Sequence, residues 1–328
     1  MGKSAPSSFV ITTERTAYSP GETVSGVIQV TTASVKCRLM VAFRGNESCT
    51  WTERHSTGTG RRRRTCVRHF RGECEIINVP IPLEASMNIG VIQIPFSFNI
   101  PKHLPSSFAM RILSVSASIG YAIDARLVED NIQILSAVSE IRIRSLPSVI
   151  ESCRTSITLP VTVCCCFNRG EVDLDFTLVD PVVPLGGVAE VHTIVNNRST
   201  KNFQRVIASV YVVLDCSTGS RSICHWEQVA ETVVEGIPAG QTDPNRRVFV
   251  NVPPNCCPTA IGTMVKVSYR ICLRVDVSWG FDPTTALPLY LYEPPGGPVP
   301  VEIPRQLASM DNERLQPFET SDPVIRFN

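Results

Sequence analysis

Apolar and polar residues alternate with a period of two along most of this chain. The two longest rows place apolar residues at every second position from Val115 to Leu127 and from Val265 to Val277. Shorter rows of the same kind lie at residues 24–30, 37–43, 92–98, 172–178 and 206–214. Such alternation is typical of β-strands with one buried and one solvated face. No helical stripe extends beyond a few turns, so the pattern predicts an all-β protein.

A turn followed by an alternating strand occurs twice. Pro20 and Gly21 precede the first strand, and proline presets φ while glycine accepts a positive φ, as a tight turn requires. A related turn at Val182–Val188 precedes the row Ala189–Val195. Two copies of one module predict two immunoglobulin-like β-sandwiches in tandem. We expect an N-terminal sandwich over residues 1–155, a cysteine-rich hinge over 156–169, a C-terminal sandwich over 170–295, and a flexible or peripherally docked tail over 296–328.

Length and charge set limits on the function. The chain has 328 residues, enough for two domains that each bury a core. Its formal net charge is +1, which gives no general preference for nucleic acid, so we expect no nucleic-acid partner. Residues 1–155 hold 18 Lys and Arg against 12 Asp and Glu, and the remaining residues hold 13 against 18. This asymmetry predicts a basic face on the N-terminal sandwich.

The thirteen cysteines are irregularly spaced and include adjacent runs, which disulfide frameworks seldom use. No apolar segment of a signal peptide follows Met1, and the apolar stretch Ile157–Phe167 is too short to span a bilayer. We therefore expect free thiols in a cytosolic protein. A secreted immunoglobulin-like protein is the alternative, because Asn46 and Asn197 begin formal glycosylation sequons.

The sequence offers no catalytic signature. It contains no nucleophile elbow, P-loop, HExxH or dinucleotide fingerprint, so we expect no enzyme, no catalytic residue and no cofactor. Cys66 and His69 have metal-ligand spacing, and Cys49, His55 and Cys74 lie nearby. A structural zinc site needs four converging ligands, and no second tight pair accompanies the first, so we expect no metal.

A run of arginines is the most distinctive candidate site. Arg61, Arg62, Arg63 and Arg64 follow one another, and Arg54, Arg68 and Arg71 flank them. The segment lies between two predicted strands, where a long hairpin loop at one end of a sandwich is expected. Guanidinium groups bind phosphate in a bidentate manner, so this loop suits an inositol lipid headgroup or a phosphorylated cargo tail. A merely solvated loop is the alternative.

Three consecutive cysteines form a second candidate site. Cys164, Cys165 and Cys166 lie at the expected domain boundary. S-acylation there gives membrane affinity to a protein with no predicted span. Inert thiols that line the hinge are the alternative interpretation.

Several segments resemble the arrestin family, and specifically its α-arrestin (arrestin-domain-containing) branch. The segments that carry the resemblance are Tyr18–Gly26, Phe43–Gly45 with Trp51–Glu53, Phe96–Pro101, Leu104–Phe108, Ile119–Leu127, Pro184–Gly186, Val195–Ser199, Val267–Ile271 and Leu287–Leu289. They occur in the family's order and cover roughly residues 9–293. The resemblance implies two arrestin-like sandwiches joined by a short hinge, and no enzymatic activity.

The resemblance also implies a role and a set of partners. Such proteins are adaptors that bind cytoplasmic tails of membrane proteins and link them to endocytic coat components or ubiquitin ligases. We therefore expect a cytoplasmic protein recruited to the plasma membrane or endosomes, with an anionic membrane surface as a further partner. α-Arrestins typically recruit ligases through Pro-Pro-x-Tyr motifs, whereas Pro294–Gly297 carries glycine in place of the tyrosine. Direct ligase recruitment is therefore not implied by these residues.

A constitutive subunit of a sorting or coat complex, resembling the arrestin-like subunit of retromer, is the alternative function. It shares the sandwich fold but works through permanent protein–protein interfaces. The segments Tyr18–Gly26 and Leu104–Phe108 are more similar to α-arrestins and favour the regulated adaptor.

Overall fold

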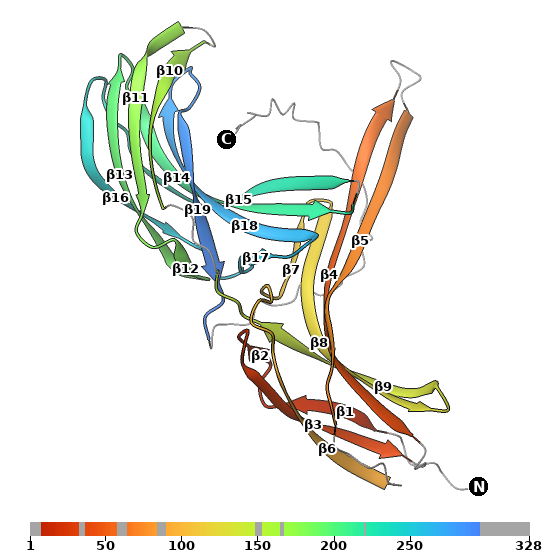
Figure 1. Cartoon of the computed structure of the whole chain (residues 1–328). Coiled ribbons are helices and arrows are strands. Elements are labelled where there is room, and N and C mark those ends of the chain that lie inside the picture. The colour runs from red at the N-terminus through yellow and green to blue at the C-terminus, as the bar shows by residue number, and fades with distance from the viewer. Residues whose placement is uncertain are drawn as a thin grey trace.

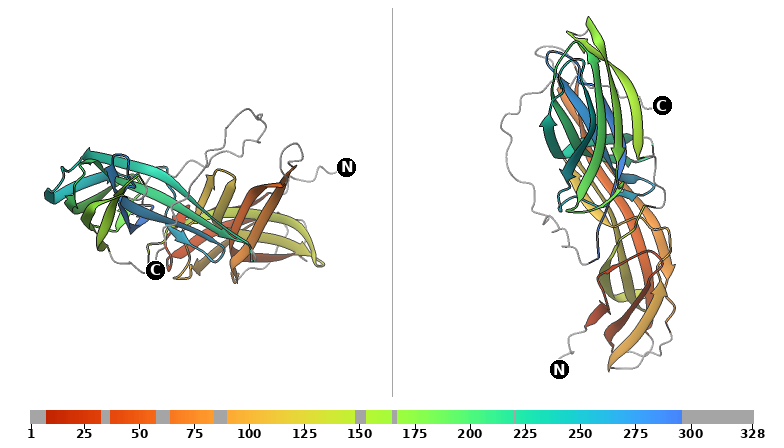
Figure 2. Two further views of the ribbon diagram at one scale, coloured as in Figure 1. Left: turned by 90° about the horizontal axis from the view of Figure 1, so that it is seen from above. Right: turned by 90° about the vertical axis from the view of Figure 1, so that its left-hand side faces the viewer.

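The computed structural model describes residues 8–32, 37–57, 64–83, 90–147, 153–164, 167–219 and 221–295. Over these ranges the chain forms strands and turns without a helix, which confirms the predicted all-β class. Figures 1 and 2 show an elongated molecule made of two β-sandwiches, with the N-terminal sandwich at one end. The predicted tail, residues 296–328, lies outside the described residues.

The N-terminal sandwich consists of two sheets. The smaller has the order β1(Phe9–Thr13), β3(Thr23–Thr32) and β6(Gly90–Asn99). The larger has the order β2(Ala17–Tyr18), β9(Ile132–Ile143), β8(Val115–Glu129), β4(Arg38–Thr57) and β5(Arg64–Pro80), and β7(Phe108–Ile112) pairs with β8. Pairing is antiparallel except between β2 and β9.

The C-terminal sandwich repeats this plan. One sheet has the order β10(Arg154–Val163), β11(Phe167–Leu178), β13(Val188–Ser199) and β16(Thr242–Asn251). The other has the order β12(Val182–Pro184), β19(Thr284–Tyr292), β18(Val265–Val277), β14(Phe203–Ser217) and β15(Ser222–Glu235), and β17(Ala260–Ile261) pairs with β18. The repeated turn–strand module of the sequence thus connects the two sheets within each sandwich, from β2 to β3 and from β12 to β13.

The alternating rows become the inner faces of the sheets. Every second residue from Val115 to Leu127 is buried in β8, and β18 buries its own predicted row from Val265 to Val277. Gly21 has a φ of +88°, as the predicted turn before the first long strand requires, and Gly186 has a φ of +77° in the second module. The periodicity therefore predicts both these strands and their buried faces correctly.

The segment expected to be the hinge forms part of a sheet. Residues 156–169 contain most of β10 and the start of β11, and these two strands pair from Arg154↔Thr177 onward. The chain instead crosses between the sandwiches after Ile143 and before Arg154. Pro160 is compatible with this strand, because β10 is an edge strand with a register shift just after Pro160, where a missing N–H is tolerated.

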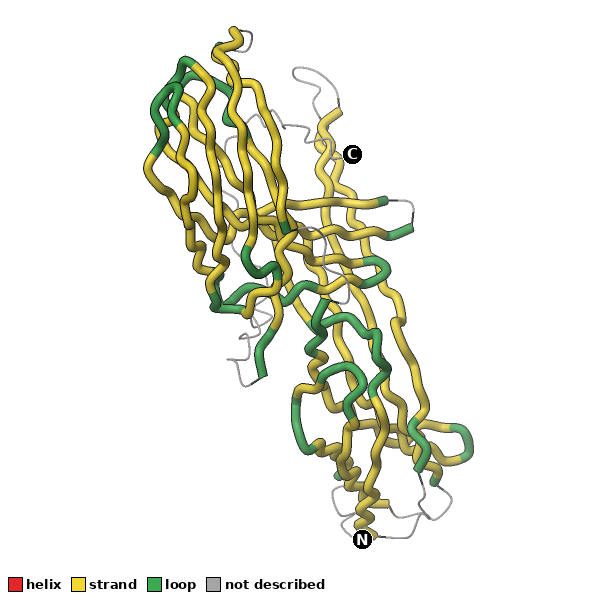
Figure 3. Tube along the Cα trace, turned by 60° about the vertical axis from the view of Figure 1, so that its left-hand side comes forward, coloured by secondary structure: helices red, strands yellow, loops and turns green. Residues whose placement is uncertain are grey.

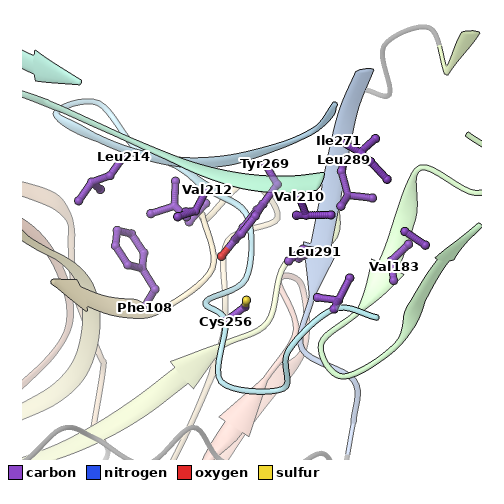
Figure 4. Packing of buried hydrophobic residues seen from close by; sticks show 14 of the residues in the cluster. Phe108, Val183, Val210, Val212, Leu214, Cys256, Tyr269, Ile271, Leu289 and Leu291 are labelled. Atoms are coloured by element: carbon purple, nitrogen blue, oxygen red, sulfur yellow. The ribbon is translucent and has the colours of Figure 1, made fainter. Parts of the chain in front are cut away.

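The two sandwiches share one continuous apolar core. Figure 4 shows Phe108, from β7 of the N-terminal sandwich, beside Leu214 and Val212 of the C-terminal sandwich. Close by, the thiol of Cys257 donates a hydrogen bond to the carbonyl oxygen of Ala109 at 3.4 Å. Burial raises the pKa of Cys257 to about 12, so this thiol is neutral at physiological pH. Apolar packing and a hydrogen bond from a neutral thiol therefore join the domains over this part of their contact.

A buried carboxylate of the N-terminal sandwich adds a specific link. Glu47 lies on the inner face of β4 and is 1% exposed. Its Oε1 accepts a hydrogen bond from the N–H of Thr263 at 2.7 Å, and its Oε2 accepts bonds from Met264 and Val265 at 2.7 and 2.9 Å. A Cβ atom on residue 262 would lie 2.5 Å from Oε2, which is a steric clash. Glycine at this position therefore allows the turn to approach the Glu47 carboxylate. One turn of the C-terminal sandwich thus binds the Glu47 carboxylate of the N-terminal sandwich through three backbone N–H groups.

A second buried carboxylate, contributed by the C-terminal sandwich and bound by the N-terminal one, also links the domains. Glu293 follows β19 of the C-terminal sandwich and is buried. Its Oε2 accepts a hydrogen bond from Arg142 at 3.0 Å, and its Oε1 accepts two from Arg144 at 2.9 and 3.0 Å. Both arginines come from the end of β9 and its continuation in the N-terminal sandwich. Each domain therefore holds one buried carboxylate of the other.

We expect Glu47→Ala to lower the free energy of unfolding by about 3 kcal/mol. The substitution leaves three buried N–H donors of the 263–265 turn without their acceptor, and hydrogen bonds to a charged group are the costly ones to lose. Denaturant unfolding followed by circular dichroism measures the change. Glu73→Ala, which removes an exposed carboxylate from the same hairpin, is the matched control and should change it by no more than about 0.5 kcal/mol. Equal effects of the two substitutions would contradict the role of Glu47.

Candidate functional site: a basic hairpin and an aromatic tip

The predicted arginine loop belongs to the hairpin of β4 and β5. The two strands pair without interruption from Asn46↔Glu75 to Thr57↔Arg64, so the hairpin extends far beyond the sheet that it starts from. Above Thr50, β4 pairs with β5 alone, because its pairing with β8 ends at Thr50↔Ser116. Figure 1 shows this part as a two-stranded ribbon beside the C-terminal sandwich. Arg61, Arg62 and Arg63 lie outside the described residues, and Arg64 begins β5.

The remaining arginines occupy both faces of the ribbon. Directly opposed residues of antiparallel strands point to the same face, and successive residues alternate. Arg68 opposes Glu53, whereas Arg54 and Arg71 lie on the other face, opposite Val67 and Thr50. The structure therefore brings Arg54 and Arg71 to one face and Arg68 to the opposite face. The described arginines of the predicted site are therefore divided between the two faces of the ribbon.

Two of the ribbon's charges are already compensated locally. Arg71 forms an ion pair and hydrogen bonds with Glu73, which raise the pKa of its guanidinium. Hydrogen bonds from His55 and then from the Trp51 indole lower the pKa of Glu53, so this carboxylate is charged and already partnered. Arg54 and Arg68 are exposed, and within the described ranges neither lies within ion-pair distance of a carboxylate. These two arginines are available to an anion.

A shallow groove on the face of Arg54 has the chemistry of an anion site. Thr52, Arg54, Val67 and His69 of the hairpin line it, together with Arg111 and Ser114 from the end of β7 and the following turn. The Thr52 hydroxyl and His69 Nδ1 lie 3.1 Å apart, and the Ser114 hydroxyl donates to the Thr52 carbonyl oxygen at 3.3 Å. None of the described residues that line this groove is a carboxylate.

The contributions of Arg111 and His69 to this groove could not be predicted from the sequence pattern. Arg111 is 57 positions from Arg54 along the chain and arrives through the pairing of β7 with β8 and of β8 with β4. His69 was considered only as a metal ligand together with Cys66. A separation of three residues places their side chains on opposite faces of β5. Among the described residues, no group of His, Cys, Asp or Glu converges as a metal site.

The far end of the C-terminal sandwich carries a cluster of exposed aromatic residues. Trp279 is 89% exposed, and Phe281 and Phe167 are also exposed. Trp279 and Phe281 come from the turn between β18 and β19, and Phe167 begins β11 directly after the neighbouring turn. We call Phe167, Trp279 and Phe281 the aromatic tip.

Backbone hydrogen bonds join the two turns of the aromatic tip. The N–H of Cys164 donates to the carbonyl oxygen of Trp279 at 3.0 Å, and the N–H of Phe281 donates to that of Thr162 at 3.2 Å. Trp279 has a φ of +62°, a left-handed conformation that is costly for a bulky residue. The fold therefore holds a large indole in solvent at a cost in strain, which is the kind of outlier that marks functional sites.

Cys164 lies within the aromatic tip region. It is exposed, with a φ of +48°, immediately after β10. Its predicted companions Cys165 and Cys166 are outside the described residues. Burial of Cys164 in a hinge is not observed, because β10 ends at the edge of the sandwich and Cys164 follows it in a surface turn.

The hairpin and the aromatic tip lie toward the same end of the molecule. Figures 1 and 3 agree that the free ends of β4 and β5 point the same way as the turns that hold Trp279 and Cys164. The two features come from different sandwiches, so their alignment depends on the domain contacts at Glu47 and Glu293. No helix among the described residues is long and apolar enough to cross a membrane.

Comparison with known families agrees with this architecture. The model for the arrestin (or S-antigen) N-terminal domain matches residues 8–153, and the one for the arrestin (or S-antigen) C-terminal domain matches residues 168–296.

The chain belongs to the arrestin family.

The two matches fall on the two sandwiches of this arrestin and leave β10 between them. No curated protein matches the chain. Arrestin domains indicate an adaptor in trafficking or signalling, so the hairpin and the aromatic tip are candidates for docking rather than catalysis.

We expect Trp279→Gly to leave the free energy of unfolding within about 1 kcal/mol of the wild-type value. The indole buries almost nothing, and glycine removes the cost of the positive φ while adding unfolded-chain entropy. Denaturant unfolding provides the measurement. Trp51→Ala, at an indole that is 1% exposed and stacked on Phe70, should instead lower it by about 3–5 kcal/mol. A comparable loss at Trp279 would mean that this side chain serves packing.

Proposed function

We propose that this arrestin is a non-enzymatic cytosolic adaptor of the α-arrestin branch that docks end-on to anionic membranes. In this role it binds cytoplasmic tails of membrane cargo and links them to endocytic coat components or to a ubiquitin ligase. The main support for the proposal is that the basic hairpin and the aromatic tip, which suit membrane binding in different ways, point toward the same end of the molecule. The basic hairpin supplies electrostatic attraction, and the aromatic tip supplies interfacial insertion.

The two features act through different physical forces. Lys and Arg residues near an anionic leaflet contribute about 1 kcal/mol each, and this attraction decreases within a Debye length as salt is added. Tryptophan and phenylalanine prefer the headgroup region, where an amphipathic or apolar ring leaves water. A guanidinium-rich hairpin therefore favours the inositol phosphate headgroups, and Trp279 and Phe281 enter the interface beside them.

S-acylation at Cys164, Cys165 and Cys166 fits the same geometry. Cys164 is exposed between β10 and β11, next to the aromatic tip, so an acyl chain attached there points to the surface that Trp279 contacts. A single acyl chain holds a protein on a membrane only marginally, and a second signal makes the attachment stable. Acyl-biotin exchange on the wild type and on a Cys164–Cys166→Ser variant tests this modification, and equal labelling of the two would reject it.

Liposome co-sedimentation tests the docking itself. We expect the wild type to bind vesicles that contain phosphatidylinositol phosphates, with affinity that falls as salt rises. Replacing Arg61, Arg62, Arg63 and Arg64 with glutamine should weaken binding at least tenfold and flatten the salt dependence. Trp279→Ala with Phe281→Ala should weaken binding about tenfold and leave the salt dependence unchanged.

A matched control separates specific docking from general charge. Arg15→Gln removes an exposed arginine that pairs with Glu22 on the N-terminal sandwich, away from both features. We expect it to bind vesicles as the wild type does. If the arginine-loop variant and the aromatic-tip variant both retain wild-type binding, end-on membrane docking is rejected.

A further inference from the structure

The outer edge of β5 is an unoccupied position for another strand. β5 is the terminal strand of its sheet and pairs with β4 alone. Within the described ranges, no backbone hydrogen bond joins residues 64–79 to any other partner. Residues 65–69 are exposed at every position, so both faces of the ribbon are open there as well as its edge. Figure 1 shows β5 as the outermost strand on its side of the molecule.

Each face of the ribbon beside this edge carries an arginine. Arg54 lies with His69 on one face, beside the groove that Arg111 completes. Arg68 lies on the other face, opposite Glu53, whose carboxylate is already hydrogen-bonded to His55 and Trp51. Further along β5 the sign reverses at Glu73 and Glu75. The positive part therefore covers about seven residues, from Thr65 to Arg71, which is the length of an ordinary strand.

We infer that the edge of β5 from Thr65 to Arg71 binds an extended acidic peptide by strand addition. The backbone of β5 supplies the hydrogen bonds, and alternate side chains of the added strand meet Arg68 on one face and Arg54 with His69 on the other. The inference rests on the proposed adaptor role, because it describes the kind of cargo segment that the adaptor takes.

Charge also explains why this edge selects its partner. An exposed edge strand invites pairing with any other strand, and proteins commonly protect such edges with charged residues. Two copies of the same basic edge repel one another, whereas an acidic strand is attracted. Two other long edge strands differ from β5, since β15 carries Glu227, Glu231 and Glu235 and β10 contains Pro160. The edge of β5 is therefore selective for acidic segments.

Fluorescence anisotropy on the full chain tests the inference without lipid. The probe is a fluorescein-labelled heptapeptide, Glu-Glu-Val-Glu-Glu-Val-Glu, whose acidic side chains lie on both faces of an extended strand. We expect saturable binding that weakens with salt. The peptide with lysine at every glutamate position should not bind. The acidic peptide N-methylated at alternate residues keeps its charge but loses its edge hydrogen bonds, and it should bind at least tenfold more weakly.

Variants locate the site and separate it from membrane docking. The double substitution Arg54→Gln with Arg68→Gln should weaken binding of the acidic peptide about three- to tenfold, because exposed charge pairs contribute only modestly to the free energy of binding. Arg154→Gln, at an exposed arginine of the other sandwich, should have no effect. The variant with glutamine at 61–64 should lose vesicle binding and keep most peptide binding, so failure of one function does not imply failure of the other.

Three results would overturn the inference. Equal binding of the N-methylated peptide would show that charge alone attracts the ligand and no strand is added. Equal binding by the Arg54 and Arg68 double variant would place the peptide elsewhere. Binding of anionic vesicles without binding of the acidic peptide would make the membrane the ligand of this edge.

Discussion

Capture of Glu47 by a turn of the other domain is the constraint on which the rest of this structure depends. A carboxylate in the middle of an apolar strand face is costly unless its charge is fully hydrogen-bonded. Three successive N–H groups at 263–265 meet that requirement, and they do so from the C-terminal sandwich. The geometry is specific, because the donors must reach one pair of oxygen atoms past Gly262. The contact therefore sets how the two sandwiches are placed.

The reciprocal contact at Glu293 gives this placement a second point of attachment. Two contacts at separate places resist rotation of one domain against the other, which a single contact does not. The apolar packing around Phe108 is less directional, since hydrophobic burial depends on area and not on orientation. The buried carboxylates thus supply orientation, and the shared core supplies most of the free energy. Through this division the basic hairpin of one domain and the aromatic tip of the other keep a common direction.

Sequence periodicity predicted the strands well because burial of every second residue is a local property. It placed the inner faces of β8 and β18 correctly and located the turn at Gly21. It missed β10, because residues 156–169 were expected to form a hinge, whereas most of them pair as an edge strand with β11. Local pattern therefore predicts strands more readily than their place in a sheet.

The candidate sites were predicted less completely for a similar reason. The arginine run was evident, but its division between two faces depends on the register of β4 with β5. Arg111 enters the groove through two intervening strand pairings, which no short-range spacing encodes. Trp279 belongs to no pattern in the sequence, and only its left-handed backbone and its exposure distinguish it. Glu47, however, interrupts the apolar row between Phe43 and Trp51, and this interruption was a usable signal.

Hydrogen–deuterium exchange on vesicles containing phosphatidylinositol phosphates tests the central claim most directly. The claim is that the domain contacts hold the hairpin and the aromatic tip as one membrane-facing end. It predicts that peptides spanning residues 52–70 and 275–285 become protected together, and that Glu47→Ala with Glu293→Ala uncouples them. Protection of only one of the two regions in the wild type, or joint protection that persists in the double variant, would contradict it.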